Sequence, residues 1–256
     1  MKNVIEFYLA ELIKLRRTFA FWLTIIGAAI IPLTMIITYV YNWKMFVPAT
    51  GVNPWDELFG RAFNGVILFM PLYIILLIGL IFNIEYKANA WKHIFVQPIS
   101  KESIFSAKYL IVFSLIVLFM VLFSVFTFLV GEIVGVYKVE LGFNNNSADF
   151  KYIFNFSIKV LIAILATTAI HFWLGLNIRN LVSVLGIGLA GIALAILMNG
   201  KGGYADFFPY AYPIMLLNYV PSSPDVYLER FHLISIVYFV LFFFLAFFQF
   251  KRSFKG

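Results

Sequence analysis

The side chains that could do chemistry in this chain are few and widely spaced. Its three histidines, His93, His171 and His232, lie far apart, no H-E-x-x-H pair occurs, and there is no cysteine for a disulfide or a thiolate metal site. An enzyme buried in a membrane would need His, Asp, Glu or a serine with its base gathered near one interface. We therefore expect no catalytic and no metal-binding residue, with a membrane-embedded lipid-processing enzyme as the alternative.

The longest charged stretch between two apolar runs is the segment 85–108. As a helix, its first half has a polar and an aromatic face. The polar face holds Glu85, Asn89, Lys92 and His93, and the other holds Tyr86, Ala90, Trp91, Ile94 and Phe95. Pro98 stops this helix and Ser100 is suited to cap the next one. This pattern is typical of a surface that binds a soluble partner, although an ordinary basic loop would carry similar lysines.

Composition decides the class of protein in which these residues must be positioned. The 256 residues are 63% hydrophobic and only 12% charged, whereas a soluble domain is about 25% charged. A soluble fold is therefore excluded, and we expect an all-α polytopic membrane protein. The net charge of +7 is spread over short loops and forms no dense patch, so we expect no nucleic-acid partner.

Six apolar runs are long enough to cross a hydrocarbon core of about 30 Å at about 1.5 Å per residue. We predict transmembrane helices at 19–41, 65–84, 109–130, 156–176, 181–198 and 231–250. With six spans, twelve lysines and arginines lie on the side of the termini and six on the other. Both termini are therefore predicted to be cytoplasmic, with the protein in the cell membrane and in contact with its lipid.

The N-terminal segment 1–18 has the pattern of an amphipathic helix at the membrane surface. Its apolar stripe consists of Val4, Ile5, Tyr8, Leu9, Leu12 and Leu15. Glu11, Lys14 and Arg17 lie opposite, and Arg16 and Arg17 are expected at the cytoplasmic headgroups.

Polar residues inside the later spans are further candidates. Thr167, Thr168 and His171 lie within the fourth span, where an ionisable residue is a candidate functional site by default. A histidine near a helix end, however, more often bonds to a backbone or threonine group. Small-residue faces in the fifth span, which pair Gly186 with Ala190 and Gly191 with Ala195, are interpreted as surfaces for close helix packing.

The segment 199–230 alternates glycine and proline with aromatic residues. It is too apolar for a solvated linker and too broken for a spanning helix. We expect short re-entrant helices that dip into the outer leaflet before the last span. Phe207, Pro209 and Pro213 lie in this region.

Two motifs carry a resemblance to a known family. They are Glu6-x4-Glu11-x2-Lys14-Leu15-Arg16-Arg17 and Glu85-x3-Asn89-Ala90-Trp91-Lys92-x5-Pro98-Ile99-Ser100, which ends in Ala107-Lys108. Over its whole length the chain resembles the ABC-2 type transporter permeases, particularly the lantibiotic-immunity and bacteriocin-export branch. The resemblance implies that 1–18 is a connecting helix, with Glu11, Lys14, Arg16 and Arg17. It also implies that 85–108 holds a cytoplasmic coupling helix that docks on an ATPase through Glu85, Lys87, Asn89, Trp91, Lys92 and His93.

The resemblance also implies partners. No G-x-x-x-x-G-K-[ST] motif occurs, so we expect this chain to bind no nucleotide or other cofactor. ATP and magnesium would bind to two copies of a separate ABC ATPase, and a second permease chain, identical or related, would complete the transporter. The implied function is the permease subunit of an exporter that moves an amphiphilic peptide or lipid-like molecule. A permease-like sensory or scaffold subunit without transport is the second alternative.

Overall fold

The computed structural model of the chain describes residues 2–88, 91, 99–198, 202–218 and 228–253. Every regular element in these ranges is a helix. Five of the helices are long and apolar enough to cross a membrane, or six if one bent pair counts as a single span. The prediction of an all-helical protein with several membrane spans is confirmed.

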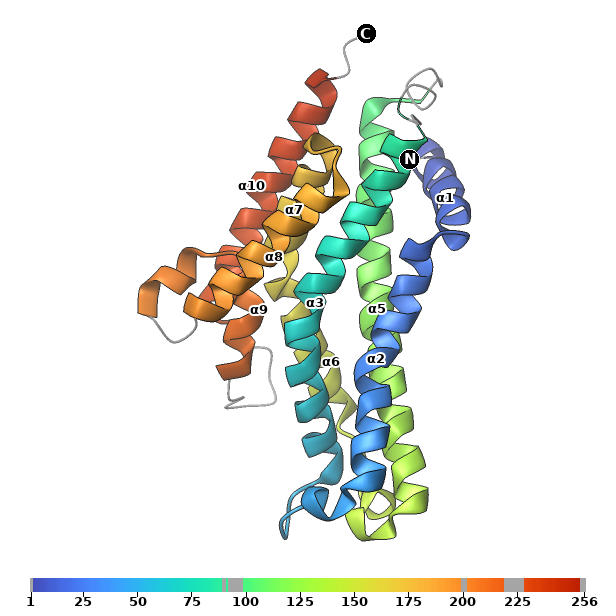
Figure 1. The fold of residues 1–256 in the computed structure, drawn as a ribbon, viewed down its shortest axis with the longest axis vertical. Helices are drawn as coiled ribbons and strands as arrows, with labels where there is room; N and C mark the ends of the chain where they lie inside the picture. The colour runs from blue at the N-terminus through green and yellow to red at the C-terminus, as the bar shows by residue number, and fades with distance from the viewer. Residues whose placement is uncertain (1, 89–90, 92–98, 199–201, 219–227, 254–256) are drawn as a thin grey trace.

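The helices follow one another along the chain as shown in Figure 1. The α-helices are α1 (Lys2–Arg16), α2 (Phe19–Tyr41), α3 (Pro54–Lys87), α5 (Lys101–Tyr137), α6 (Phe150–Ala163), α7 (Leu165–Asn177), α8 (Leu181–Met198), α9 (Ala211–Met215) and α10 (Arg230–Ser253). The short 3-10 helices are η1 (Trp43–Phe46), η2 (Val139–Leu141), η3 (Phe143–Asn145), η4 (Gly202–Phe207) and η5 (Leu216–Asn218).

The long helices α2, α3 and α5 run side by side, and α7, α8 and α10 form a second group beside them (Figure 1). The helix α1, the end of α3, the start of α5 and the end of α10 all lie at one end of the molecule, which we call the inner end (Figure 1). The predicted spans 19–41 and 181–198 agree with α2 and α8 at both ends.

Two helices extend well beyond the predicted membrane spans 65–84 and 109–130. At about 1.5 Å per residue, the 34 residues of α3 and the 37 of α5 extend about 51 and 55 Å, beyond the roughly 30 Å of a hydrocarbon core. Residues 54–64 lie outside the predicted span 65–84, and from the sequence we interpret Asn53-Pro54 as the turn of an outer loop. That interpretation is wrong, because Asn53 accepts a hydrogen bond from the Trp55 backbone and Pro54 occupies the first helical position of α3.

The predicted fourth span is a bent pair of helices. The axes of α6 and α7 differ by 41°, with the break at Ile164. No proline or glycine lies at the break. Instead, the Ser235 hydroxyl of α10 donates to the carbonyls of Ile162 (2.8 Å) and Ala163 (3.2 Å) and accepts from the Ala166 backbone (3.2 Å). A side chain from a distant helix thus satisfies the freed backbone groups and stabilises the kink.

Glycines let α8 approach its neighbours. A methyl group built on Gly188 would lie 2.6 Å from Ile75 and 2.8 Å from His171, and one on Gly191 would lie 2.8 Å from the Tyr210 ring. Of the faces predicted from small residues, the one with Gly191 and Ala195 is therefore packed inside the chain, whereas Gly186 faces open space. The short helices expected in 199–230 are present as η4, α9 and η5; residues 199–201 and 219–227 lie outside the described residues.

The Ser235 contact at the α6–α7 break generates a first prediction. Replacing Ser235 with alanine removes the hydroxyl that bonds to two carbonyls and one amide at the break, so we expect Ser235→Ala to lower the free energy of unfolding by about 1–2 kcal/mol. Ser183→Ala, on the exposed side of α8, is the matched control and should change it by less than about 0.5 kcal/mol. Unfolding followed by circular dichroism in mixed micelles measures both, and equal losses would contradict this role of Ser235.

Candidate functional site

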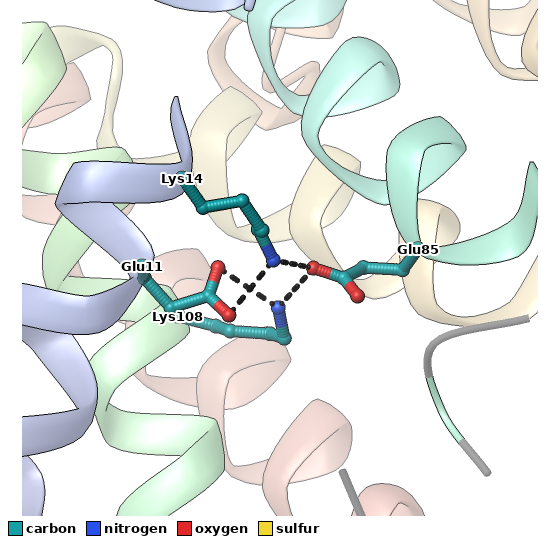
Figure 2. A network of polar contacts seen from close by, with 4 residues as sticks. All are labelled: Glu11, Lys14, Glu85 and Lys108. Carbon is teal, nitrogen blue, oxygen red and sulfur yellow. Dashed lines mark hydrogen bonds and ion pairs between the residues drawn. The ribbon is translucent and has the colours of Figure 1, made fainter. Parts of the chain in front are cut away.

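Four charged side chains from three helices meet at the inner end of the molecule. They are Glu11 and Lys14 of α1, Glu85 of α3 and Lys108 of α5, which we call the four-charge cluster (Figure 2). Glu11, Glu85 and Lys108 are only 4%, 0% and 1% exposed, while the Lys14 side chain is 36% exposed. Two carboxylates and two ammonium groups balance each other, so the cluster carries no net charge.

The signs of the charges alternate around the cluster. Lys14 Nζ donates to Glu11 Oε1 at 2.9 Å and also to Glu85 Oε1. Lys108 Nζ donates to Glu85 Oε1 at 2.7 Å and lies 3.2 Å from Glu11 Oε2. Each ammonium therefore faces both carboxylates, and Figure 2 shows the two lysines meeting on one oxygen of Glu85.

This arrangement has a physical reason. A buried charge is costly unless an opposite charge and hydrogen bonds compensate it. Burial lowers the pKa of Lys14, but the neighbouring Glu11 and Glu85 carboxylates raise it by more, so that its pKa lies above the ordinary value. Lys14 therefore remains charged at neutral pH, as the balance of the cluster requires.

The structure corrects the sequence prediction for Glu11, Lys14 and Glu85. Glu85 was placed on the water-facing side of a surface helix, but it belongs to the last turn of α3 and is buried. Glu11 and Lys14 were placed opposite the apolar stripe of a helix on the membrane surface, but they point toward α3 and α5 (Figure 2). A periodic pattern shows only the helix that contains it, whereas the partners here come from other helices.

The exposed side of α1 is mostly apolar, although it also carries the exposed Glu6. Ile5, Leu9 and Ile13 follow one another at every fourth position and are largely exposed, whereas the predicted stripe had placed Ile5 and Leu9 with the buried Leu15. Arg16 and Arg17 are exposed next to them at the end of α1. This helix therefore has one face toward the four-charge cluster and another that is suited to lipid.

Trp91 is the one described residue between 89 and 98, and it packs against the cluster. It is buried, and Lys108 Nζ lies 5.3 Å from the centre of its ring, within the range of a cation–π contact. The Trp91 ring also contacts Phe82 of α3 at 6.3 Å and Phe250 of α10 at 5.8 Å. Trp91, which the sequence places in the coupling segment, thus packs directly on the cluster.

The remaining residues predicted for the coupling helix divide into two groups. Lys87 is exposed at the end of α3. Asn89, Lys92 and His93 lie outside the described residues, so their role stays a prediction. Ser100 was predicted to cap the next helix, and it does so by accepting a hydrogen bond from the Ser103 backbone at 3.2 Å.

A second polar site brings together two groups predicted separately. Thr167 of α7 donates to the Pro209 carbonyl at 3.3 Å, and His171 Nε2 lies 2.9 Å from the Tyr210 hydroxyl. Thr168 instead bonds within its own helix, to the Ile164 carbonyl. Polar residues of the fourth span thus hold the segment that follows η4.

The other two residues predicted in that segment have different environments. Phe207 is largely exposed, and Pro213 is buried in α9. Three residues whose side chains join one helix to another segment were missed as site residues: Lys108, Tyr210 and Ser235. Lys108 ends the second motif of the family resemblance, which was a usable signal, whereas Tyr210 is one aromatic among many in its segment.

The described residues contain no group of three or more His, Cys, Asp or Glu side chains that could hold a metal ion. The polar contacts at both sites join helices to one another. Contacts of this kind fix the position of one helix relative to the next.

Comparison with known proteins gives one match. A family model described as "ABC-2 family transporter protein" matches residues 8–196, which run from α1 through most of α8 and include all four residues of the four-charge cluster. No curated protein and no solved structure matches the chain.

The balance of the four-charge cluster generates a second prediction. Glu85→Gln leaves two lysines facing one carboxylate, so we expect it to lower the free energy of unfolding by about 3 kcal/mol. The double variant Glu85→Gln/Lys108→Met restores neutrality and should recover part of that loss. Glu57→Gln breaks a partly exposed pair with Arg61 and is the control, with an expected loss below about 0.5 kcal/mol. A double variant as unstable as the sum of its single variants would contradict the balance of charges.

Proposed function

Because the chain belongs to the ABC-2 family of transporter proteins, we propose that it is the permease subunit of an ATP-binding-cassette exporter. The chain is a multi-pass membrane protein, and its family is a membrane component that associates with an ABC ATPase. It contains no G-x-x-x-x-G-K-[ST] motif. In this proposal ATP and magnesium bind to two copies of a separate ATPase, and a second permease chain completes the path.

The observation that carries the proposal is the four-charge cluster beneath Trp91. A force on 85–108 reaches Trp91, then Lys108 through the cation–π contact, and from there α1 and α3 through the two carboxylates. Separating these charges in a medium of low dielectric constant is costly. The three helices are therefore expected to move as one rigid body when the ATPase pulls on the loop.

The exposed face of α1 supports the proposed orientation. Ile5, Leu9 and Ile13 would rest on the acyl chains, and Arg16 and Arg17 would contact anionic headgroups. In this proposal the inner end, with both termini, lies in the cytoplasm. The segment 85–108 is then on the side where ATP is available.

The proposal extends to the class of substrate. Apart from the four-charge cluster, the interior is mostly apolar and aromatic, with scattered polar groups such as Thr167 and His171. A path lined by such residues would suit an amphiphilic peptide or a lipid-like molecule better than a sugar or an ion. We therefore propose an amphiphilic cargo, with export of a lantibiotic or bacteriocin peptide as the specific case.

Assembly with an ATPase tests this proposal, as a third prediction. The chain is expressed with each ABC ATPase of its native host, and the purified complex is assayed for ATP hydrolysis. Lys92→Glu should reduce assembly several-fold, because it reverses a charge at the proposed docking surface. Lys44→Glu, an equal charge reversal on the opposite side of the membrane in this topology, is the control and should leave assembly unchanged.

A variant of the cluster separates docking from coupling. Glu85 is buried, so Glu85→Gln should retain the ATPase but disturb the response of hydrolysis to substrate. Failure of every host ATPase to assemble with the chain would contradict the proposed function and favour a sensory or scaffold subunit. Hydrolysis of lipid by the purified chain alone would favour an enzyme.

A further inference from the structure

We infer that α10 is a rigid link that couples the four-charge end of the molecule to the short-helix segment 202–218. The contacts of α10 at its two ends carry this inference. It holds whatever supplies energy to the chain, so it extends beyond the proposed function.

At the inner end, α10 is fixed to the surroundings of the four-charge cluster. The Phe250 ring lies 5.8 Å from that of Trp91, which itself covers Lys108. Phe250 also lies 5.8 Å from Phe105 of α5, and Lys251 Nζ lies 2.7 Å from Glu102 Oε1 at the start of α5. The end of α10 must therefore follow any displacement of Trp91 and of the first turns of α5.

One face of α10 continues this attachment along the helix. Phe239, Phe243 and Phe247 recur at every fourth position, and all of them contact α5. Ring centres are 5.3 Å apart for Phe247 and Phe105 and 4.9 Å apart for Phe243 and Tyr109. Aromatic pairs at these distances add to the area they bury, so α10 is held to the inner half of α5.

Toward its other end, α10 holds the short-helix segment. The Tyr238 hydroxyl donates to the Phe207 carbonyl of η4 at 2.9 Å, and its ring lies 6.3 Å from that of Tyr212 in α9. Arg230 and Asp206 add an exposed ion pair at 3.8 Å. A shift of α10 along its axis would therefore pull on both η4 and α9.

Between these two ends, α10 contains no residue at which helices commonly kink. From Arg230 to Ser253 it contains neither proline nor glycine, whereas α2 and α3 contain Pro32 and Pro71 and α6 and α7 are bent. Helices bend sharply at such interruptions. Tyr238 and Phe250 are twelve residues apart, or about 18 Å along the axis, and that distance should stay constant when one end moves.

Thiol labelling tests the link, because the chain has no cysteine of its own. Ala205 of η4 is only 6% exposed, so Ala205→Cys reacts with a polar thiol reagent only when the segment lifts from its neighbours. The full chain is reconstituted in nanodiscs without any partner. Gly203→Cys, which is exposed in the same short helix, corrects for the intrinsic rate of reaction.

Phe250→Ala, at the far end of α10, should raise the labelling rate of Ala205→Cys about fivefold or more. Tyr238→Phe removes only the hydroxyl that donates to Phe207 and should raise it by a similar factor. If both act through α10, the double variant should be labelled much more slowly than the product of the two factors predicts. Such non-additivity would not arise from two unrelated losses of packing.

Two controls remove the same kind of side chain. Phe7→Ala empties a buried aromatic site in α1, and Phe248→Ala removes an exposed ring from α10 itself. Both should leave labelling near the parental rate. A cooperative thermal transition shows that each variant is folded, and Phe250→Leu replaces Phe250→Ala if the alanine variant fails this check.

Parental labelling in the folded Phe250 variant would overturn the inference, and so would full additivity in the double variant. Neither result involves an ATPase. Failure of the link is therefore distinguishable from failure of the proposed function.

Discussion

The structure depends on the pairing of four charges, three of which are buried. Glu11, Lys14, Glu85 and Lys108 come from three helices. Glu11, Glu85 and Lys108 are each at most 4% exposed. An isolated charge at such a position is costly. The helices α1, α3 and α5 must therefore pack at one height along the molecule, each rotated so that its charged residues face the cluster. The apolar packing that surrounds the cluster would tolerate small displacements of these helices. The alternation of charges would not.

A small number of side-chain contacts connects this cluster to the other helices. The Trp91 ring lies over Lys108 and contacts Phe250 of α10. Also on α10, the Tyr238 hydroxyl donates to the Phe207 carbonyl, and Ser235 bonds to the backbone at the break between α6 and α7. In a bilayer there is no water to replace a lost partner. Each of these contacts therefore fixes one part of the chain relative to another.

The sequence predicted the ends of a helix well where residues of that helix set them. It was insufficient where a contact with a helix distant in the chain determined the structure. The spans 19–41 and 181–198 agree with α2 and α8, because polar and turn-forming residues bound both runs. The start of α3 was missed because Asn53 and Pro54 serve a turn and a helix cap equally well. Helical periodicity placed Glu85 at the surface, since it cannot show Lys108 on another helix. The α6–α7 break has its cause in Ser235, far along the chain.

The central claim is that alternation of charge, and not net charge, docks α1 on α3 and α5. Hydrogen exchange of the α1 amides in nanodiscs measures this docking directly. Inverting all four charges (Glu11→Lys, Lys14→Glu, Glu85→Lys and Lys108→Glu) keeps both the net charge and the alternation, so we predict protection close to that of the parent. Inverting Glu85 and Lys108 alone keeps the net charge but places like charges side by side, and protection should be lost. Equal protection in the two variants would contradict the account.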